Sequence, residues 1–230
     1  MNKKRIIGHI VAQNAIADIL RAIESLQFSC DEIYLVDGGS TDGMRELLEQ
    51  RKSFYKLKIF DRKFDTLKNQ RQFLLDQTDR DTWVLVLDQD ERLSQIAQYA
   101  ARKLVESVNE ELYKNRELPL VFTMNHFNLI DDIFHYSGAA VPHNMRLFYN
   151  DPKLKWGGPD YHCYLVHEGK EHEHFVNLLP VVGGFGTLHY ARLDPARIQE
   201  KKKNPAKGDG YNKNSWIEEG EVRELPPEYY

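Results

Sequence analysis

The first half of the chain alternates short apolar runs with segments in which apolar residues recur every three or four positions. The runs are rich in Val, Ile and Leu and end in polar turns, as strands do, and they span 6–11, 32–36, 57–60 and 82–87. The segments with helical spacing span 15–28 and 66–76, begin at Met44, and follow Ser94. This alternation predicts a mostly parallel sheet with helices on both faces.

The second half of the chain has a different pattern. Glycine-rich turns separate its apolar runs, and helical spacing is hard to find before Asp194. The strand-like runs span 120–127, 145–149, 161–166 and 175–182. These features predict antiparallel strands and long loops added to the end of a parallel sheet. We therefore expect a single α/β domain over 1–230, with a first half at 1–93, a second half at 94–193, and a C-terminal helix and tail at 194–230.

Acidic residues follow the most apolar of the predicted strands. Residues 83–87 contain no charged side chain, which is the pattern of a strand buried on both faces, and Asp88-Gln89-Asp90-Glu91 comes directly after them. Ligands of open α/β sheets bind at the carboxyl ends of strands, and residues two apart on a strand point the same way. The Asp88 and Asp90 carboxylates are therefore suited to share Mg²⁺ or Mn²⁺ with a bound diphosphate. The alternative is an acidic helix start capped by Ser94.

The glycine-containing turn at 37–43 follows the second predicted strand. It does not match a dinucleotide-binding fingerprint, because the third position, counted from Gly38, is Ser40. It does not match a phosphate-binding P-loop either, since no Gly-Lys-Ser/Thr follows. We interpret Asp42 as a carboxylate at a helix N-terminus. Asp37, at the strand end, is placed to accept hydrogen bonds from a ribose or a nucleobase.

Composition restricts the class of protein. The chain has 230 residues, of which 41% are hydrophobic and 29% charged, and this is typical of a globular domain with an ample core. The net charge of −4 gives no overall basic surface for nucleic acid. Two cysteines and the lack of a signal peptide or a long apolar run predict a cytoplasmic protein. The basic start Lys3-Lys4-Arg5 leaves peripheral membrane contact open.

Four segments together resemble the family 2 glycosyltransferases, whose GT-A fold has a Rossmann-like, mostly parallel sheet flanked by helices. In chain order these segments are Gln13-Asn14, 36–42, 64–69 and 83–91. Three later segments are similar to markers of the subgroup resembling lipopolysaccharide-core sugar transferases. They are 146–148, 166–168 and 188–190.

The resemblance implies that a sugar moves, with inversion, from a nucleoside-diphosphate sugar to an acceptor hydroxyl. A UDP-sugar is the favoured donor, and a saccharide or lipid-linked saccharide the expected acceptor. Residues 1–93 would form the donor site and 94–193 the acceptor site. The residues expected to bind the donor nucleotide are Gln13, Asn14, Asp37, Gly39, Asn69 and Asp88. Those expected to hold Mn²⁺ or Mg²⁺ are Asp90, Asp88 and His189.

An inverting transfer in one step also needs a carboxylate base beside the acceptor hydroxyl. Because the first half forms the donor site, we expect this base in the second half. Glu168, within the marker at 166–168, is the first candidate. Asp160, which follows Gly157-Gly158-Pro159 in a loop able to move, is the second.

Three other functions stay open at this point. A sugar nucleotidyltransferase would share the strand–helix start, but it would need a Gly- and Arg-rich phosphate loop at 11–14, where the sequence is Val-Ala-Gln-Asn. A non-catalytic carbohydrate-binding protein would need no pair of metal-binding carboxylates. A transferase acting on a modified nucleic-acid base could bind the phosphate backbone through Lys201-Lys202-Lys203 and Lys207, despite the acidic net charge.

Overall fold

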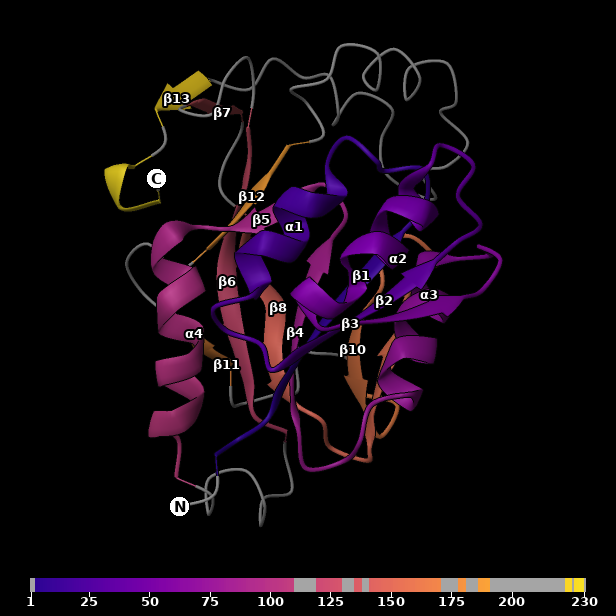
Figure 1. Ribbon diagram of the computed structural model, residues 1–230. Helices are drawn as coiled ribbons and strands as arrows, with labels where there is room; N and C mark the ends of the chain where they lie inside the picture. The colour runs from indigo at the N-terminus through magenta and orange to yellow at the C-terminus, as the bar shows by residue number, and fades with distance from the viewer. Residues whose placement is uncertain are drawn as a thin grey trace.

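The computed structural model in Figure 1 describes residues 3–109, 119–129, 135–137, 141–170, 178–180, 186–190, 222–224 and 226–229. It is a mixed α/β structure around one large, mostly parallel sheet with some antiparallel strands, as the sequence predicts. The predicted helix after Asp194 and the lysines at 201–203 and 207 lie outside the described residues.

The first half forms the elements that its pattern predicts. They are β1 (Ile6–Ala12), α1 (Ile19–Leu26), β2 (Glu32–Asp37), α2 (Met44–Tyr55), β3 (Leu57–Asp61), α3 (Leu67–Asp76), β4 (Trp83–Asp88) and, after a short strand, α4 (Gln95–Ser107). Ser94 caps α4, as expected, and Thr66 caps α3, each through a side-chain oxygen that accepts a backbone N–H. Helix α1 begins later than predicted, because residues 16–18 form a turn in which the Asp42 carboxylate binds the N–H of Ile16. None of the described helices is long and apolar enough to cross a membrane.

The main sheet joins both halves of the chain in the order β3-β2-β1-β4-β8-β6-β12-β5. Its later strands are β5 (Glu91–Leu93), β6 (Val121–Asn128), β8 (Val141–Tyr149) and β12 (Gly186–His189), with β11 (Leu178–Pro180) paired to β6. Strand β8 is antiparallel to both β4 and β6, as the second-half pattern predicts. Strands β11 and β12 instead run parallel to β6, and β5 is a strand that no apolar run predicts.

Alternate residues of the central strands face two hydrophobic layers. On β1, Ile6 and Ile10 pack into the cluster that contains α1, α2 and α4, whereas Ile7 and Val11 pack toward Leu74 of α3 on the opposite face. Figure 1 shows α4 running alongside β6, which belongs to the same sheet. Both faces of the parallel strands are therefore buried, and this explains their unbroken apolar runs.

A two-stranded sheet packs against α3. Strands β9 (Leu154–Gly157) and β10 (Tyr164–His167) are antiparallel, and Trp156 and Leu165 cluster with Leu75 of α3. The loop between the two strands lies beside the start of α3, where the N–H of Lys68 donates to the carbonyl of Asp160 (2.9 Å). This packing determines where the second half meets the ends of the parallel strands.

The last described residues return to the main sheet. Strand β13 (Val222–Glu224) pairs with β7 (His135–Ser137), and the short helix η3 (Pro227–Tyr229) follows. The buried Tyr229 ring packs edge-on against Phe127, and its hydroxyl accepts a hydrogen bond from Asn125 (2.8 Å). These contacts hold the end of the chain against β6.

Candidate functional site

Polar residues gather where the parallel strands of the main sheet end. Strands β1, β2, β4, β6 and β12 run in one direction, so their carboxyl ends meet at the same edge. The last residues of β2, β4, β6 and β12 are Asp37, Asp88, Asn128 and His189. This edge is where ligands of open α/β sheets bind, so we call it the carboxyl edge and place the candidate site there.

The turns after β1 and β2 form one hydrogen-bonded unit. The buried Asp37 carboxylate accepts both the N–H (3.1 Å) and the hydroxyl of Ser40. Asn14 donates its N–H to the Ser40 hydroxyl (2.9 Å), and its side-chain oxygen accepts the N–H of Thr41 (2.8 Å). Asn14 has φ +50, a conformation that Asn tolerates better than most residues, and Gly39 has φ +95 with open space beside its Cα. The predicted donor residues of these two turns therefore lie together.

Gln89 links the acidic turn after β4 to the same unit. Its side-chain oxygen accepts the N–H of Gln13 (2.7 Å), and the Gln13 amide donates to the carbonyl of Gly38 (3.1 Å). The turns that follow β1, β2 and β4 are thus joined by side-chain hydrogen bonds. Gln89 is the middle residue of the Asp-x-Asp pattern, which leaves its identity unspecified, so sequence reasoning missed it.

Two buried arginines hold Asp88. Arg71 of α3 donates to Oδ1 of Asp88, and Arg146 of β8 donates to Oδ2 (3.3 Å). Burial by itself raises the pKa of the Asp88 carboxyl, but the two guanidinium groups outweigh it and keep that pKa well below its usual range. Both carboxylate oxygens of Asp88 already bind cationic groups, which makes this side chain a poor additional metal ligand.

Glu91 supports the acidic turn from inside. Its Oε2 accepts the N–H of Asp88 (2.9 Å), and its Oε1 accepts a hydrogen bond from Arg146 (2.6 Å) and lies 3.4 Å from Nδ1 of His126. Burial raises the pKa of Glu91 to about 7, with Arg146 opposing and the charge of Asp88 reinforcing that shift. Because Glu91 is only 2% exposed, its role is to shape the turn and not to contact a ligand.

Asp90 and His189 form the pair best suited to a metal ion. Nε2 of His189 lies 3.3 Å from Oδ2 of Asp90, and the N–H of Tyr190 donates to the Asp90 carbonyl (2.8 Å), which ties the end of β12 to the acidic turn. Nδ1 of His189 lies 2.8 Å from Oδ1 of Asn128. When Nδ1 carries the proton and donates it to Asn128, the Nε2 lone pair faces the Asp90 carboxylate.

The Asp90–His189 pair fits a metal ion that binds together with a diphosphate. Among the described residues, no three His, Cys, Asp or Glu side chains lie close enough to hold a metal by themselves. Asp90 and His189 offer one carboxylate oxygen and one imidazole nitrogen, a set that Mn²⁺ accepts more readily than Mg²⁺. Diphosphate oxygens and water would complete the coordination. The structure thus brings two of the three predicted metal ligands, Asp90 and His189, together. The third, Asp88, is bound by two arginines.

Asp160 lies at the carboxyl edge, in the loop between β9 and β10. Its carboxylate pairs with Nζ of Lys68 (2.8 Å) and is 44% exposed. In the same loop, Sγ of Cys163 lies 3.5 Å from Nη1 of Arg71, the residue that binds Asp88. The loop therefore borders the acidic turn.

Glu168 lies toward the opposite edge of the sheet. Its N–H donates to the carbonyl of Lys153 (3.3 Å), and its exposed carboxylate pairs with the Lys153 ammonium (2.7 Å), which lowers the pKa of Glu168. The nearby Asn150 donates its N–H to the carbonyl of Thr82, just before β4 begins. At about 3.3 Å per residue, the length of β4 separates this region from Asp88 by roughly 17 Å. The structure does not bring Glu168 to the acidic turn.

Asn69 lies in the first turn of α3. Its N–H donates to the Thr66 hydroxyl (3.1 Å), and its amide donates to the Asp65 carboxylate (3.0 Å). These contacts stabilise the helix start, and the described contacts do not join Asn69 to the acidic turn.

Sequence reasoning missed two charged members of the site. Arg71 and Arg146 both occupy positions within otherwise apolar faces, and they are 7% and 5% exposed. A buried arginine almost always has an acidic partner, so an arginine at an apolar position is the signal that could have revealed them. Asn128 carries no comparable signal, because an uncharged amide at a strand end is common.

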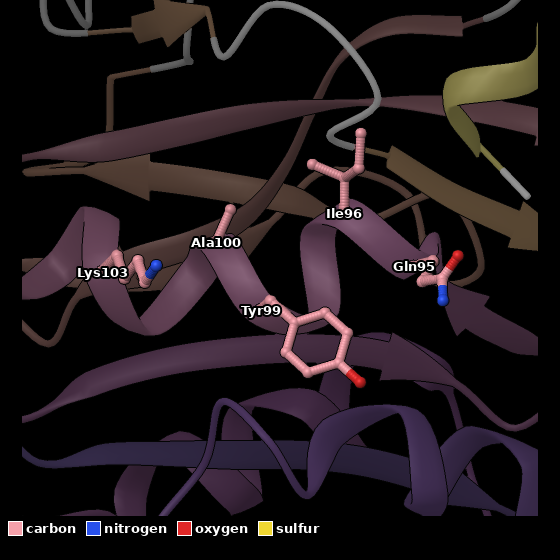
Figure 2. Close-up of a pocket in the computed structure, with 5 residues that line it drawn as sticks. All are labelled: Gln95, Ile96, Tyr99, Ala100 and Lys103. Carbon is pink, nitrogen blue, oxygen red and sulfur yellow. The ribbon is translucent and has the colours of Figure 1, made fainter.

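A hollow on α4 does not belong to this site. Figure 2 shows the side chains that line it, which project from successive turns of that one helix. They are Gln95, Ile96, Tyr99, Ala100 and Lys103. The lining is mostly apolar, and it offers no carboxylate for a metal and a single lysine, Lys103, for a phosphate.

Comparison with known proteins gives a family match and a fold match. Residues 9–121 match the family model described as glycosyl transferase family 2, and this segment includes Asp37, Asp88 and Asp90. No curated protein matches the chain.

Solved structures of TarS from S. aureus are similar to this chain. TarS aligns with a TM-score of 0.54 and 15% identity, over 85% of this chain and 38% of that chain. Its 1–349 fragment has the same score and identity, over 85% and 62%. That fragment in complex with UDP-GlcNAc aligns with a TM-score of 0.42 and 19% identity, over 53% and 35%. The chain therefore spans less than two thirds of these structures, and the TM-score of 0.54 to TarS and to its 1–349 fragment establishes a shared GT-A fold.

Proposed function

We propose that this protein is a metal-dependent glycosyltransferase that moves a sugar, with inversion, from a nucleoside-diphosphate sugar to a hydroxyl of a saccharide or lipid-linked saccharide. The observation that carries the proposal is the convergence of Asp90 and His189 at the carboxyl edge, beside the linked turns that contain Asp37. The family match over 9–121 supports sugar transfer as the chemistry. The fold shared with TarS, which was crystallised with UDP-GlcNAc, supports a UDP-sugar as donor.

The donor is proposed to lie across the carboxyl edge. Asp37 and the Asn14–Ser40 contact hold the nucleoside end, and Asp88, fixed by two arginines, accepts a hydrogen bond from the ribose. Asp90 and His189 hold Mn²⁺ or Mg²⁺ at the diphosphate. When bound, the metal stabilises the negative charge that develops on the departing diphosphate.

The catalytic base is proposed to be Asp160. Its loop borders the acidic turn, whereas Glu168 is ion-paired near the start of β4. An acceptor hydroxyl approaching Asp160 would have to compete with Lys68 for the carboxylate. We expect Asp160→Asn to lower kcat by about 10²-fold or more, the usual scale of general-base catalysis, while donor binding is kept. Glu168→Gln is the matched control and should turn over normally; the reverse result would move the base to Glu168.

Calorimetric titration with UDP and an assay of UDP-sugar hydrolysis test the donor site. Wild-type protein with Mn²⁺ should bind UDP. Either EDTA or Asp90→Asn should weaken binding by about tenfold or more, because the charged contact between the metal and the diphosphate is lost. Asp76→Asn, at the exposed end of α3, serves as the charge-matched control. If UDP bound equally well in EDTA and to Asp90→Asn, the metal would have no part in donor binding. If no nucleotide sugar were bound or cleaved, the proposed activity would be wrong.

A further inference from the structure

An arginine with no charged partner in the described part of the chain lies beside the candidate metal pair. Arg92 is the middle residue of β5, two positions after Asp90. Its Nε is buried and makes no hydrogen bond, and no carboxylate of the described residues pairs with its guanidinium. The guanidinium instead lies over the ring of Tyr190, with its Cζ 5.0 Å from the ring centroid.

A second arginine contacts the same ring. Cζ of Arg21, in α1, lies 4.3 Å from the Tyr190 centroid, and this side chain is 44% exposed and also pairs with Asp18. Tyr190 is 6% exposed, and its buried hydroxyl makes no hydrogen bond. Because the N–H of Tyr190 binds the carbonyl of Asp90, the ring that both arginines contact lies next to the acidic turn.

The electrostatics of this arrangement favour an anion. Two guanidinium groups within about 5 Å of one ring repel each other, and a cation–π contact offsets only part of that repulsion. Asp18 neutralises Arg21 in part, but Arg92 retains a partly buried charge, which is unfavourable without a partner. A phosphate or carboxylate group would supply the missing charge, and a guanidinium can bind either one through two parallel hydrogen bonds.

We propose that Arg92 and Arg21, stacked on Tyr190, form a subsite for an anionic group of the acceptor, either phosphate or carboxylate. The assignment to the acceptor rests on the proposed function, in which a metal held by Asp90 and His189 already meets the charge of the donor diphosphate. The acceptor class is therefore a phosphorylated or carboxylated saccharide.

Binding of inorganic phosphate and of acetate, measured by calorimetry at constant ionic strength, tests the subsite directly. The titrations are run in Mg²⁺ buffer with saturating UDP, so that the donor site is filled. Arg92→Gln should raise the phosphate Kd by about tenfold or more, as the loss of a charge-assisted hydrogen bond predicts, and Arg92→Lys should keep much of the binding. Arg51→Gln, an exposed arginine of α2, is the matched control and should bind as wild type does.

Two outcomes would overturn the proposal. Equal phosphate and acetate affinity in wild type and Arg92→Gln would make the stack purely structural, and anion binding that is seen without UDP but lost at saturating UDP would assign Arg92 to the donor diphosphate. Should Arg92→Gln fail to fold, as judged by its thermal melt, Arg21→Gln gives the loss-of-charge comparison, and Arg92→Lys remains the variant that should keep much of the binding. The tighter of the two probes identifies the acceptor group. UDP binding is measured on the same samples. If UDP does not bind, the proposed function fails; if UDP binds but Arg92→Gln leaves anion binding unchanged, only the subsite fails.

Discussion

Replacing Arg146 by Met tests whether the buried charges hold the acidic turn in place. Arg146 is the residue that contacts both Asp88 and Glu91, and its side chain is 6% exposed. Methionine fills a similar volume but leaves the Glu91 carboxylate, which is only 2% exposed, without its guanidinium partner. Asp88 keeps only Arg71. Removing one partner of a buried pair costs about 3–5 kcal/mol, because the remaining carboxylate must either stay charged away from water or take up a proton.

Urea unfolding of metal-free protein at pH 7.5 measures this cost. We expect Arg146→Met to lose about 3–5 kcal/mol, and the double variant with Glu91→Gln to recover a part of it, since the orphaned charge is then removed. The control is Arg80→Met, whose guanidinium binds Asn150 near the surface and should cost about 1 kcal/mol or less. If the Arg146 and Arg80 variants lost the same small amount, the acidic turn would not depend on the buried network.

Substitutions at three further residues test other parts of the structure. Asp37→Ala should weaken UDP binding by about tenfold, because a carboxylate acceptor is lost and the Ser40 turn is released; unchanged calorimetric affinity would place Asp37 outside the donor site. Gln89→Ala should lower UDP affinity by roughly threefold to tenfold, whereas Gln89→Glu keeps the acceptor oxygen and should bind nearly normally in the same titration. His9 is buried against Thr78, and burial lowers its pKa to about 3. The unfolded chain therefore takes up a proton below about pH 6.5 that the folded protein does not. The free energy of unfolding should therefore fall by about 2 kcal/mol as the pH is lowered from 7 to 5. His9→Gln should remove that part of the pH dependence, as measured by urea unfolding. The same pH dependence in both proteins would contradict it.

The strands and helices of the first half were predictable because their signals are local. Each parallel strand is buried on both faces and reads as an unbroken apolar run, and Ser94 precedes an amphipathic helix as a cap should. Strand β5 could not be predicted in this way. It has only three residues, two of them charged, and it exists because it pairs with β12, nearly a hundred positions later.

The residue pattern predicted site residues only at the ends of recognisable strands. Asp37 ends β2, and Asp90 lies two residues after the end of β4. His189, which lies beside Asp90, was expected from the family resemblance alone, because its place depends on the pairing of β12 with β6 and has no local signal. Glu168 was recognised from its sequence marker, but a marker does not say where the residue lies in the fold. Strand β10 runs so that its last residues, and Glu168 after them, lie near the start of β4.

The charges at the carboxyl edge divide into a set that pairs with itself and a second set beside it. Asp88 and Glu91 bind Arg71 and Arg146, so two negative groups meet two positive groups and the set needs no further ion. In the second set, His189 lies against Asp90, and the Arg92 guanidinium lies over an aromatic ring with no carboxylate of the described residues paired to it. An anion at Arg92 is thus the ligand that electrostatics favours, and the main-chain bond between Asp90 and Tyr190 keeps that place next to the proposed metal pair.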